Sequence, residues 1–304
     1  MQTKYNTGVH QTTRSVFYTL VLFICATISA IDFANAQTKI TISKDTGKID
    51  LGYISKTIVG NNKQTEAKVK AIIKWANANL QWTANDYINR TAKEILCKGG
   101  GECAEEAKVV TALFDEAKIQ WRRINEINIQ PEDKGRQHRA DSLVKLRGFT
   151  NSVFGLLYND HVWLEYYDND KKKWQPADPT TGLVGLNTWL RSRVGFGARP
   201  MNKIIATKDM LVPIFIVTTT RKDKAFDENR SSYYLITAFN SVYKNKLSAL
   251  PEWKNWVRLI QDISPKCMGA FEGTVNLHQY TDEIGQIRES YLKLKDEYQK
   301  SIKA

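Results

Sequence analysis

The sequence lacks the motifs by which most cofactor and metal enzymes are recognised. It has no phosphate-binding loop, no dinucleotide-binding fingerprint, no CxxC pair and no group of His, Asp and Glu residues at metal-ligand spacing. Only four histidines and four cysteines occur among its 304 residues. We therefore expect neither a cofactor nor a metal ion.

Long apolar runs are also scarce, and the longest lies near the start of the chain. Val16–Ala30 is apolar, follows a segment that carries Lys4 and Arg14, and precedes Ala34-Asn35-Ala36, a small-x-small cleavage site. The run is too short for a typical transmembrane helix. Residues 1–36 are therefore predicted to be a signal peptide that is cleaved after Ala36.

The position of Cys25 within this run argues against a lipid anchor. A lipoprotein signal would have a small residue before the cysteine, whereas the bulky Ile24 stands there. No later apolar stretch approaches the length of a membrane span. The mature chain is predicted to be exported to the periplasm or the extracellular space, without a transmembrane segment.

Basic residues are abundant but do not form runs. The chain has 44 Lys and Arg against 32 Asp and Glu, for a formal net charge of +12. Because no basic run is interleaved with aromatic residues, no nucleic-acid partner is predicted. The excess predicts a weak association with anionic polymers of the cell envelope, and the alternative is that it only keeps the protein soluble.

Cleavage of the leader would leave an odd number of cysteines, namely Cys97, Cys103 and Cys267. In an oxidising compartment an odd number leaves one thiol unpaired. If Cys97 pairs with Cys267, the free thiol is that of Cys103. The alternatives are that all three stay reduced and buried, or that Cys97 pairs with Cys103 and blocks it.

A glycine-rich turn, Gly99–Glu102, delivers Cys103 to the start of a predicted helix. Three further apolar residues share one face of that helix with the cysteine: Ala107, Val110 and Phe114. A helix N-terminus favours thiolate, whereas the glutamates of the same turn oppose it, so a cationic partner such as an imidazolium is needed. The alternative is a helix with a small buried cysteine.

A predicted β-hairpin supplies a histidine and an aspartate. An aromatic and β-branched run that ends at Tyr167 predicts a strand, six polar residues predict a turn, and the chain returns from Trp174. If these two aromatics face each other, Asp178 lies on the same face as His161 and diagonal to it, where a carboxylate can orient an imidazole. A register shift of one residue would turn Asp178 to the opposite face.

The remaining elements follow from hydrophobic periodicity and from turn residues. Residues 37–64 are predicted to be an N-terminal extension with a strand at Ile40–Ile42. Helices are predicted over 65–80, 92–96 and 103–118, followed by a strand over 119–124. Beyond residue 182 the patterns predict a strand over 211–219, an uncertain segment over 231–243, a helix from Pro251 and a last amphipathic helix over 284–298.

The order of these motifs resembles the transglutaminase-like superfamily, which has a papain-like cysteine fold, and it resembles a secreted bacterial member. The matching segments are 91–96, 101–103, 107–114, 161–165 and 174–180. The resemblance implies an α+β fold in which the nucleophile-bearing helix packs on an antiparallel sheet. The catalytic core would span 65–182, and a mainly helical C-terminal extension with one strand would span 183–304.

The resemblance also implies a Cys103-His161-Asp178 triad that transfers acyl groups of a peptide or protein substrate through a thioester. Trp82 is a candidate oxyanion donor through its indole N–H, and the alternative is a core aromatic. A cysteine peptidase or amidase is the main hypothesis. A cross-linking transglutaminase would use an amine acceptor, and a non-catalytic binding module would keep the fold without the activity.

Overall fold

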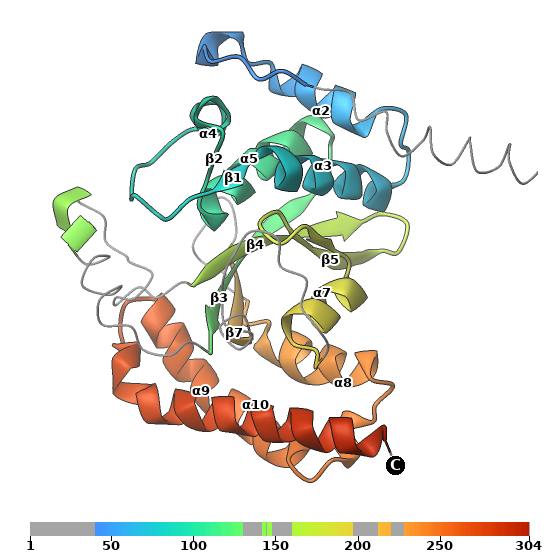
Figure 1. Ribbon diagram of the computed structural model, residues 1–304, viewed down its shortest axis with the longest axis vertical. Helices are drawn as coiled ribbons and strands as arrows, with labels where there is room; N and C mark the ends of the chain where they lie inside the picture. Colours follow the sequence, from blue (N-terminus) through green and yellow to red (C-terminus); the bar gives the residue numbers. More distant parts are fainter. Residues whose placement is uncertain are drawn as a thin grey trace, which may run out of the picture. The chain divides into compact units, whose positions relative to one another are not determined.

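An antiparallel sheet of five strands lies at the centre of the structure (Figure 1). The strand order is β6-β5-β4-β3-β7, and all neighbouring strands are antiparallel. The strands are β3 (Trp121–Asn128), β4 (His161–Asp168), β5 (Lys173–Asp178), β6 (Leu183–Val184) and β7 (Pro213–Thr219). A separate parallel pair consists of β1 (Gln81–Trp82) and β2 (Gly100–Gly101).

The computed structural model describes residues 40–129, 142–143, 145–147, 160–196, 212–219 and 228–303. Ile42–Ala304 form one compact unit, and this unit contains the sheet and its helices. The predicted signal peptide, residues 1–36, lies outside the described residues. No helix within the described ranges is both long enough and apolar enough to cross a membrane.

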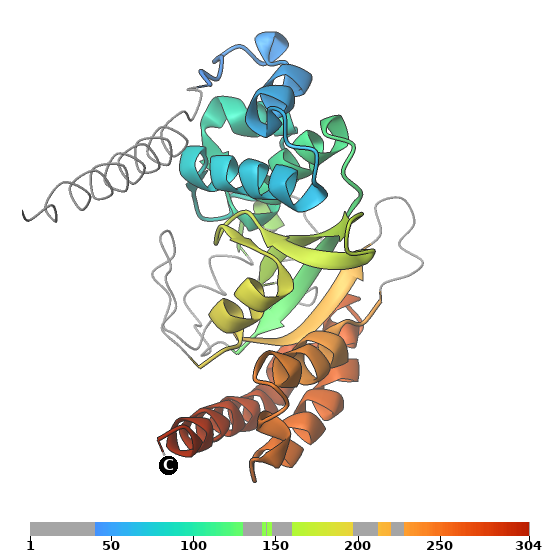
Figure 2. The same cartoon turned by 90° about the vertical axis from the view of Figure 1, so that its right-hand side faces the viewer.

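Four helices lie on one side of the sheet (Figures 1 and 2). They are α2 (Leu51–Val59), α3 (Thr65–Asn79), α4 (Ala92–Lys98) and α5 (Cys103–Glu116). Helices α3 and α5 contact β4 directly, and α2 and α4 pack on α5. The predicted inward face of α5 is confirmed, because the side chains of Ala107, Val110 and Phe114 are at most 2% exposed.

The predicted strand at Ile40–Ile42 is wrong. The described residues of this region form a 3-10 turn at Thr46–Lys48 and then helix α2. Helix α2 begins after Asp50, whose carboxylate caps it by accepting the backbone N–H of Tyr53. Burial of one face of α2 against α3 and α5 stabilises this helix. A strand of only three residues at Ile40–Ile42 would bury much less apolar surface.

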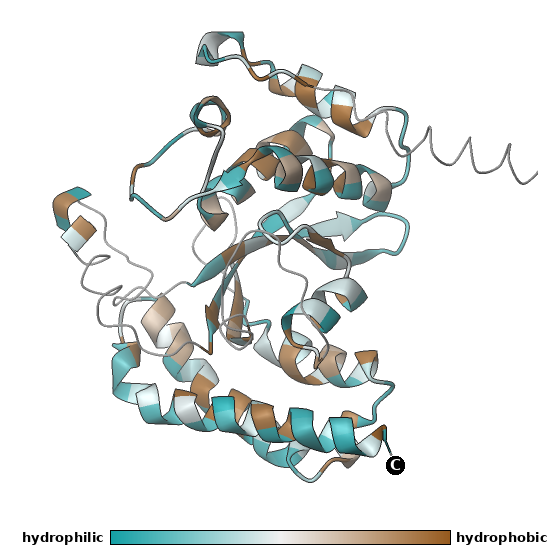
Figure 3. Cartoon of the chain, viewed as in Figure 1, coloured by the Kyte–Doolittle hydropathy of each residue, from teal (hydrophilic) through white to brown (hydrophobic). Residues whose placement is uncertain are grey.

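The C-terminal helices lie on the other side of the sheet (Figures 1 and 2). They are α7 (Leu186–Arg193), a π-helix (Tyr233–Ala238), α8 (Phe239–Val242), α9 (Trp253–Phe271) and α10 (Thr281–Ser301), with 3-10 turns at Leu247–Ala249 and Leu277–Tyr280. The uncertain segment 231–243 is thus helical. Helix α10 shows alternating hydrophilic and hydrophobic bands (Figure 3), and its residues Ile287, Tyr291 and Leu294 are buried against α9 and its neighbours.

The predicted C-terminal extension shares the sheet of the core. Strand β7 pairs with β3, with Thr218 opposite Ile124, and the side chains of 214–217 are fully buried. Helix α9 packs on β7, and α7 packs on β5 and β6. Residues beyond 182 therefore help to build the surroundings of the sheet strands that carry His161 and Asp178.

Candidate active site

Two glycines that precede α5 lie very close to neighbouring parts of the chain. Gly100 has a φ of +146°, and a Cβ there would lie 2.0 Å from the Gln81 carbonyl oxygen. A Cβ on Gly101 would lie 2.2 Å from Glu105 Oε2. Only glycine lets β2 run this close to β1 and to the first turn of α5, so the turn fixes where Cys103 begins the helix.

The side chain of Glu102 caps α5 and also contacts the thiol. Its carboxylate accepts the backbone N–H groups of Ala104 at 2.8 Å and Glu105 at 3.0 Å. The Cys103 thiol donates to Glu102 Oε2 at 3.3 Å. The residue before the cysteine is therefore both the helix cap and a hydrogen-bond acceptor for the candidate nucleophile.

The pKa of the Cys103 thiol is raised well above its usual range. Burial is the largest cause, and the negative charge of Glu102 adds to it, whereas a hydrogen bond from the Val162 backbone and the charge of Arg123 act in the opposite direction. The surroundings of Cys103 thus favour the thiol over the thiolate. Because the Val162 backbone acts on the thiol, the sulfur lies near the start of β4, the strand whose first residue is His161.

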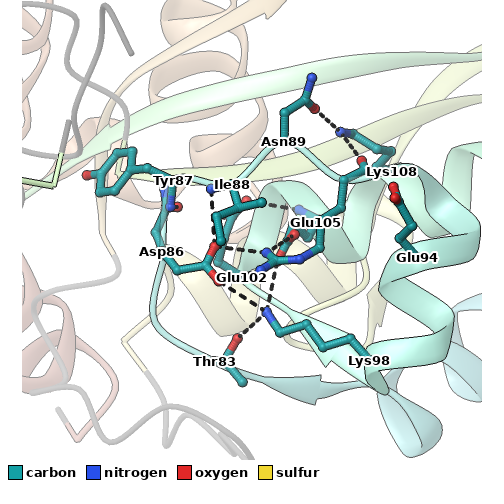
Figure 4. Close-up of polar contacts among 12 residues, drawn as sticks. Thr83, Asp86, Tyr87, Ile88, Asn89, Glu94, Lys98, Glu102, Glu105 and Lys108 are labelled. Atoms are coloured by element: carbon teal, nitrogen blue, oxygen red, sulfur yellow. Dashed lines mark hydrogen bonds and ion pairs between the residues drawn. The ribbon is translucent and has the colours of Figure 1, made fainter. Parts of the chain in front are cut away.

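Two further glutamates, Glu105 and Glu106, lie in the first turn of α5, and Glu105 is paired with cations. Arg90 Nη1 lies 2.9 Å from Glu105 Oε1, and Lys98 Nζ lies 3.5 Å from Glu105 Oε2. Arg90 also holds Asp86 through two hydrogen bonds of 2.8 and 2.6 Å. Figure 4 shows Asp86, Lys98 and Glu105 pointing toward one another in this cluster. Of the three glutamates at the start of α5, Glu102 is the one whose charge acts on the thiol.

The predicted contact between the histidine and the aspartate is present. The hairpin has Tyr167 opposite Trp174, as the sequence predicts, and His161 Nε2 lies 2.9 Å from Asp178 Oδ2. Because a carboxylate only accepts, Nε2 carries the hydrogen and Nδ1 is left as the basic nitrogen. Burial alone would raise the pKa of Asp178, but the charge and hydrogen bond of His161 and the charge of Arg193 lower it to about 2.

Sequence comparison identifies the family of this segment. Residues 53–179, which include Cys103, His161 and Asp178, match the family model of the transglutaminase-like superfamily. This segment, which is less than half of the chain, is similar to transglutaminase-like domains. The resemblance predicted from the sequence is thereby confirmed, as is the α+β fold with its antiparallel sheet and helical C-terminal region. No curated protein matches the chain.

Solved structures give weaker similarity. A Cytophaga hutchinsonii protein assigned provisionally as a cysteine protease is 20% identical over 49% of this chain and 42% of its own, with a TM-score of 0.32. A provisionally assigned protease of Parabacteroides distasonis is 12% identical over 61% and 28%, with a TM-score of 0.35. Legionella pneumophila LapG is 12% identical over 65% and 91%, with a TM-score of 0.32. The chain spans less than half of the first two proteins.

The three candidate triad residues are only partly connected. His161 and Asp178 are hydrogen-bonded, and both are buried. The half-buried Cys103 donates to Glu102 instead, and among the described residues no hydrogen bond joins its sulfur to the His161 ring. Catalytic hydrogen bonds are often long or unformed without substrate, so this geometry is compatible with a triad that closes when substrate binds.

Trp82 lies next to the turn that carries the nucleophile. Its Cα pairs with that of Gly101 in the β1–β2 ladder, two residues before Cys103. Its side chain is 39% exposed, so it is not the core aromatic that was the alternative interpretation. The indole thus belongs to the surface beside the start of α5, and its role as an oxyanion donor stays a prediction.

Sequence reasoning missed two charged residues behind the histidine, Arg193 and Glu126. Arg193 Nη1 lies 3.1 Å from Asp178 Oδ2, and Arg193 Nη2 hydrogen-bonds Glu126. Glu126 also accepts the indole N–H of Trp163 at 2.7 Å. Nothing in the sequence distinguishes this arginine from its neighbours, because it falls in a segment of arginines and glycines without periodicity.

The three cysteines outside the predicted leader are all free. Cys97 is half-buried and donates to the Ser43 carbonyl oxygen at 3.4 Å, and Cys267 is fully buried in the C-terminal region. The structure therefore has neither the Cys97–Cys267 nor the Cys97–Cys103 disulfide, and the thiol of Cys103 is unblocked. No cluster of His, Cys, Asp and Glu within the described ranges is arranged to hold a metal ion.

A Glu102→Gln variant is expected to make Cys103 react at lower pH. The negative charge of Glu102 raises the pKa of the thiol, so its removal lowers that pKa, while the glutamine oxygen can still cap α5. The measurement is the pH midpoint of Cys103 alkylation by iodoacetamide, followed by mass spectrometry. Glu116→Gln at the far end of α5 is the control, and an unchanged or higher midpoint in Glu102→Gln would contradict the assignment.

Proposed function

We propose that the protein is an exported cysteine-dependent acyl-transfer enzyme, a peptidase or amidase that works through a thioester intermediate. The observation that carries the proposal is the His161–Asp178 hydrogen bond, which leaves Nδ1 of His161 as the basic nitrogen. His161 is the first residue of β4, and α5, which begins with Cys103, packs on that strand. A carboxylate that holds an imidazole in one tautomer next to a cysteine at a helix start is the arrangement that acyl transfer requires.

The chemistry then follows from the residues in order. The Cys103 thiol turns from Glu102 toward Nδ1, gives up its proton to His161, and its sulfur attacks the substrate carbonyl. Asp178 stabilises the resulting imidazolium, which returns the proton to the leaving amine. The backbone N–H of Cys103 and the indole N–H of Trp82 are the candidate donors to the oxyanion. Water then releases the acyl group from the sulfur.

Peptide substrates offered with and without added primary amines test the proposal. Purified protein is incubated with peptide libraries, and the products are identified by mass spectrometry. Hydrolysed peptides that are absent from a Cys103→Ala sample support a peptidase or amidase, whereas amine adducts would point to a transglutaminase. Binding of peptides without any product would support the non-catalytic binding module instead.

Export is the second part of the proposal. The apolar run of residues 16–30 and the cleavage site at 34–36 support it. Protein isolated from the exporting cell is expected to begin at Gln37. N-terminal sequencing that finds Met1, on protein held in a membrane, would contradict export by a cleaved signal.

A further inference from the structure

We propose that Arg193, which lies beyond the transglutaminase-like match, is a positioning residue that holds Asp178 as the charged, fixed partner of His161. The inference rests on the proposed acyl-transfer function, because it assigns Arg193 a role in that same site. It also gives residues beyond 182 a part in the chemistry, since Arg193 is the last residue of α7.

The first argument is the way in which the Asp178 carboxylate is held. Arg193 is 1% exposed, and its Nη1 lies 3.1 Å from Oδ2, the same oxygen that His161 Nε2 contacts at 2.9 Å. The other oxygen, Oδ1, accepts the backbone N–H groups of Thr180 at 3.1 Å and Thr181 at 3.2 Å. With both oxygens engaged, the carboxylate cannot rotate away from the imidazole.

The second argument is the charge of the buried cluster. Asp178 and Glu126 are both buried, and Arg193 bridges them. With a neutral His161 the four groups carry one net negative charge, and with an imidazolium they are neutral. The cluster is thus built to accept one proton at His161. Without the arginine, two buried carboxylates would face the imidazole with no fixed cation between them.

The third argument is that α7 is fixed where it presents this arginine. The helix begins after Gly185, whose backbone N–H donates to the Pro176 carbonyl on β5 at 2.8 Å. The Arg193 guanidinium lies 5.5 Å from the ring of Trp189, which in turn lies 4.6 Å from the ring of Trp163 on β4. The position of Arg193 is therefore set by packing on both strands of the candidate site.

Other charged groups of the candidate site come from α5, from β3 and from the residue before β4. The buried Glu106 of α5 accepts the hydroxyl of Thr180 at 2.7 Å. Glu102 and Cys103 come from the start of α5, and Arg123 from β3 interacts with both. Asp160 precedes His161, and its carboxylate accepts the backbone N–H of Asn128 at 2.7 Å. These groups are the same in every variant below, so a change in the titration of His161 can be attributed to Arg193 and Glu126.

The test is the titration of the His161 ring, followed by NMR of protein with ¹³C-labelled histidine and assigned with a His161→Ala sample. In Arg193→Met the imidazolium loses a neighbouring cation and keeps both carboxylates, so the midpoint should move up by about one pH unit or more. In the double variant Glu126→Gln/Arg193→Met the net charge is that of the wild type, and the midpoint should return toward the wild-type value.

Activity and fold provide the remaining readouts. In the pH profile of kcat/KM, the acid limb should move to higher pH in Arg193→Met and return toward the wild-type position in the double variant. Arg193→Lys should retain more activity than Arg193→Met. Arg191→Met is the matched control on α7, because Arg191 is exposed and bonds Asn187 and the Val242 carbonyl. Thermal unfolding of each variant separates these effects from loss of the fold.

The outcomes separate the two proposals. A His161 midpoint that is the same in the wild type, Arg193→Met and the double variant would overturn the role of Arg193, whatever the activity. A wild-type protein without acyl-transfer activity would overturn the proposed function, while the NMR titration would still decide whether Arg193 controls His161. If Arg193→Met does not fold, Glu126→Gln is compared with the double variant, because the two differ only at residue 193. The His161 midpoint should be higher in the double variant, and equal midpoints would overturn the role of Arg193.

Discussion

A Cys103→Ala variant is expected to lose acyl transfer completely while it keeps the fold. The sulfur is the atom that would form the thioester, and no other described cysteine is placed to replace it, since Cys97 bonds Ser43 and Cys267 is buried. His161→Ala should lose acyl-transfer activity to the same extent, because a nucleophile and its base act as one unit. Losses of this kind are on the order of a million-fold in kcat.

The measurement is kcat on a peptide found in the substrate screen, with circular dichroism as the check on folding. Cys97→Ala is the matched control, because it removes a half-buried thiol of the same domain and should leave kcat unchanged. If Cys103→Ala or His161→Ala retained more than a trace of the wild-type rate in folded protein, the triad would be wrong.

An Asp178→Asn variant is expected to lose a factor of about a hundred or more in kcat and to remain folded. Asparagine can still accept the backbone N–H groups of Thr180 and Thr181, so the local turn is preserved. It cannot stabilise an imidazolium by charge, and its amide can favour the wrong tautomer of His161. Arg193 would stay paired with Glu126, so no buried cation is left without a partner.

Asp160→Asn is the control for this variant. Asp160 precedes His161 on the chain, but its carboxylate accepts the Asn128 backbone N–H, and in the described chain it makes no hydrogen bond to the imidazole. Its replacement should change kcat little, since an asparagine oxygen can accept the same N–H. Equal losses in the two variants would show that Asp178 has no special relation to His161.

The parts of the site that local patterns specify were predictable from the sequence. The spacing of Ala107, Val110 and Phe114 fixes which face of α5 is buried, because the helical period leaves one solution. The hairpin register with Tyr167 opposite Trp174 follows from the turn length and the alternation of side chains, and it brings Asp178 to His161.

The parts that depend on distant contacts were not predictable. Arg193 reaches Asp178 only after α7 has packed on β5, and no local pattern reports that packing. The ion pairs of Glu105 with Arg90 and Lys98 likewise form only in the tertiary fold. Helix α2 is a different case, since Asp50 before it and Gly60 after it are the residues that commonly begin and end a helix.

The most direct test of the account is the rate at which each cysteine is alkylated by iodoacetamide at neutral pH, measured by peptide mass spectrometry. If His161 is the base for Cys103, it takes the thiol proton as the sulfur attacks, so Cys103 should be alkylated despite the raised pKa of its thiol. His161→Ala should slow the alkylation of Cys103 by about tenfold or more while leaving Cys97 unchanged. A Cys103 that reacts at the same rate with and without His161 would contradict the assignment of Cys103 as the nucleophile.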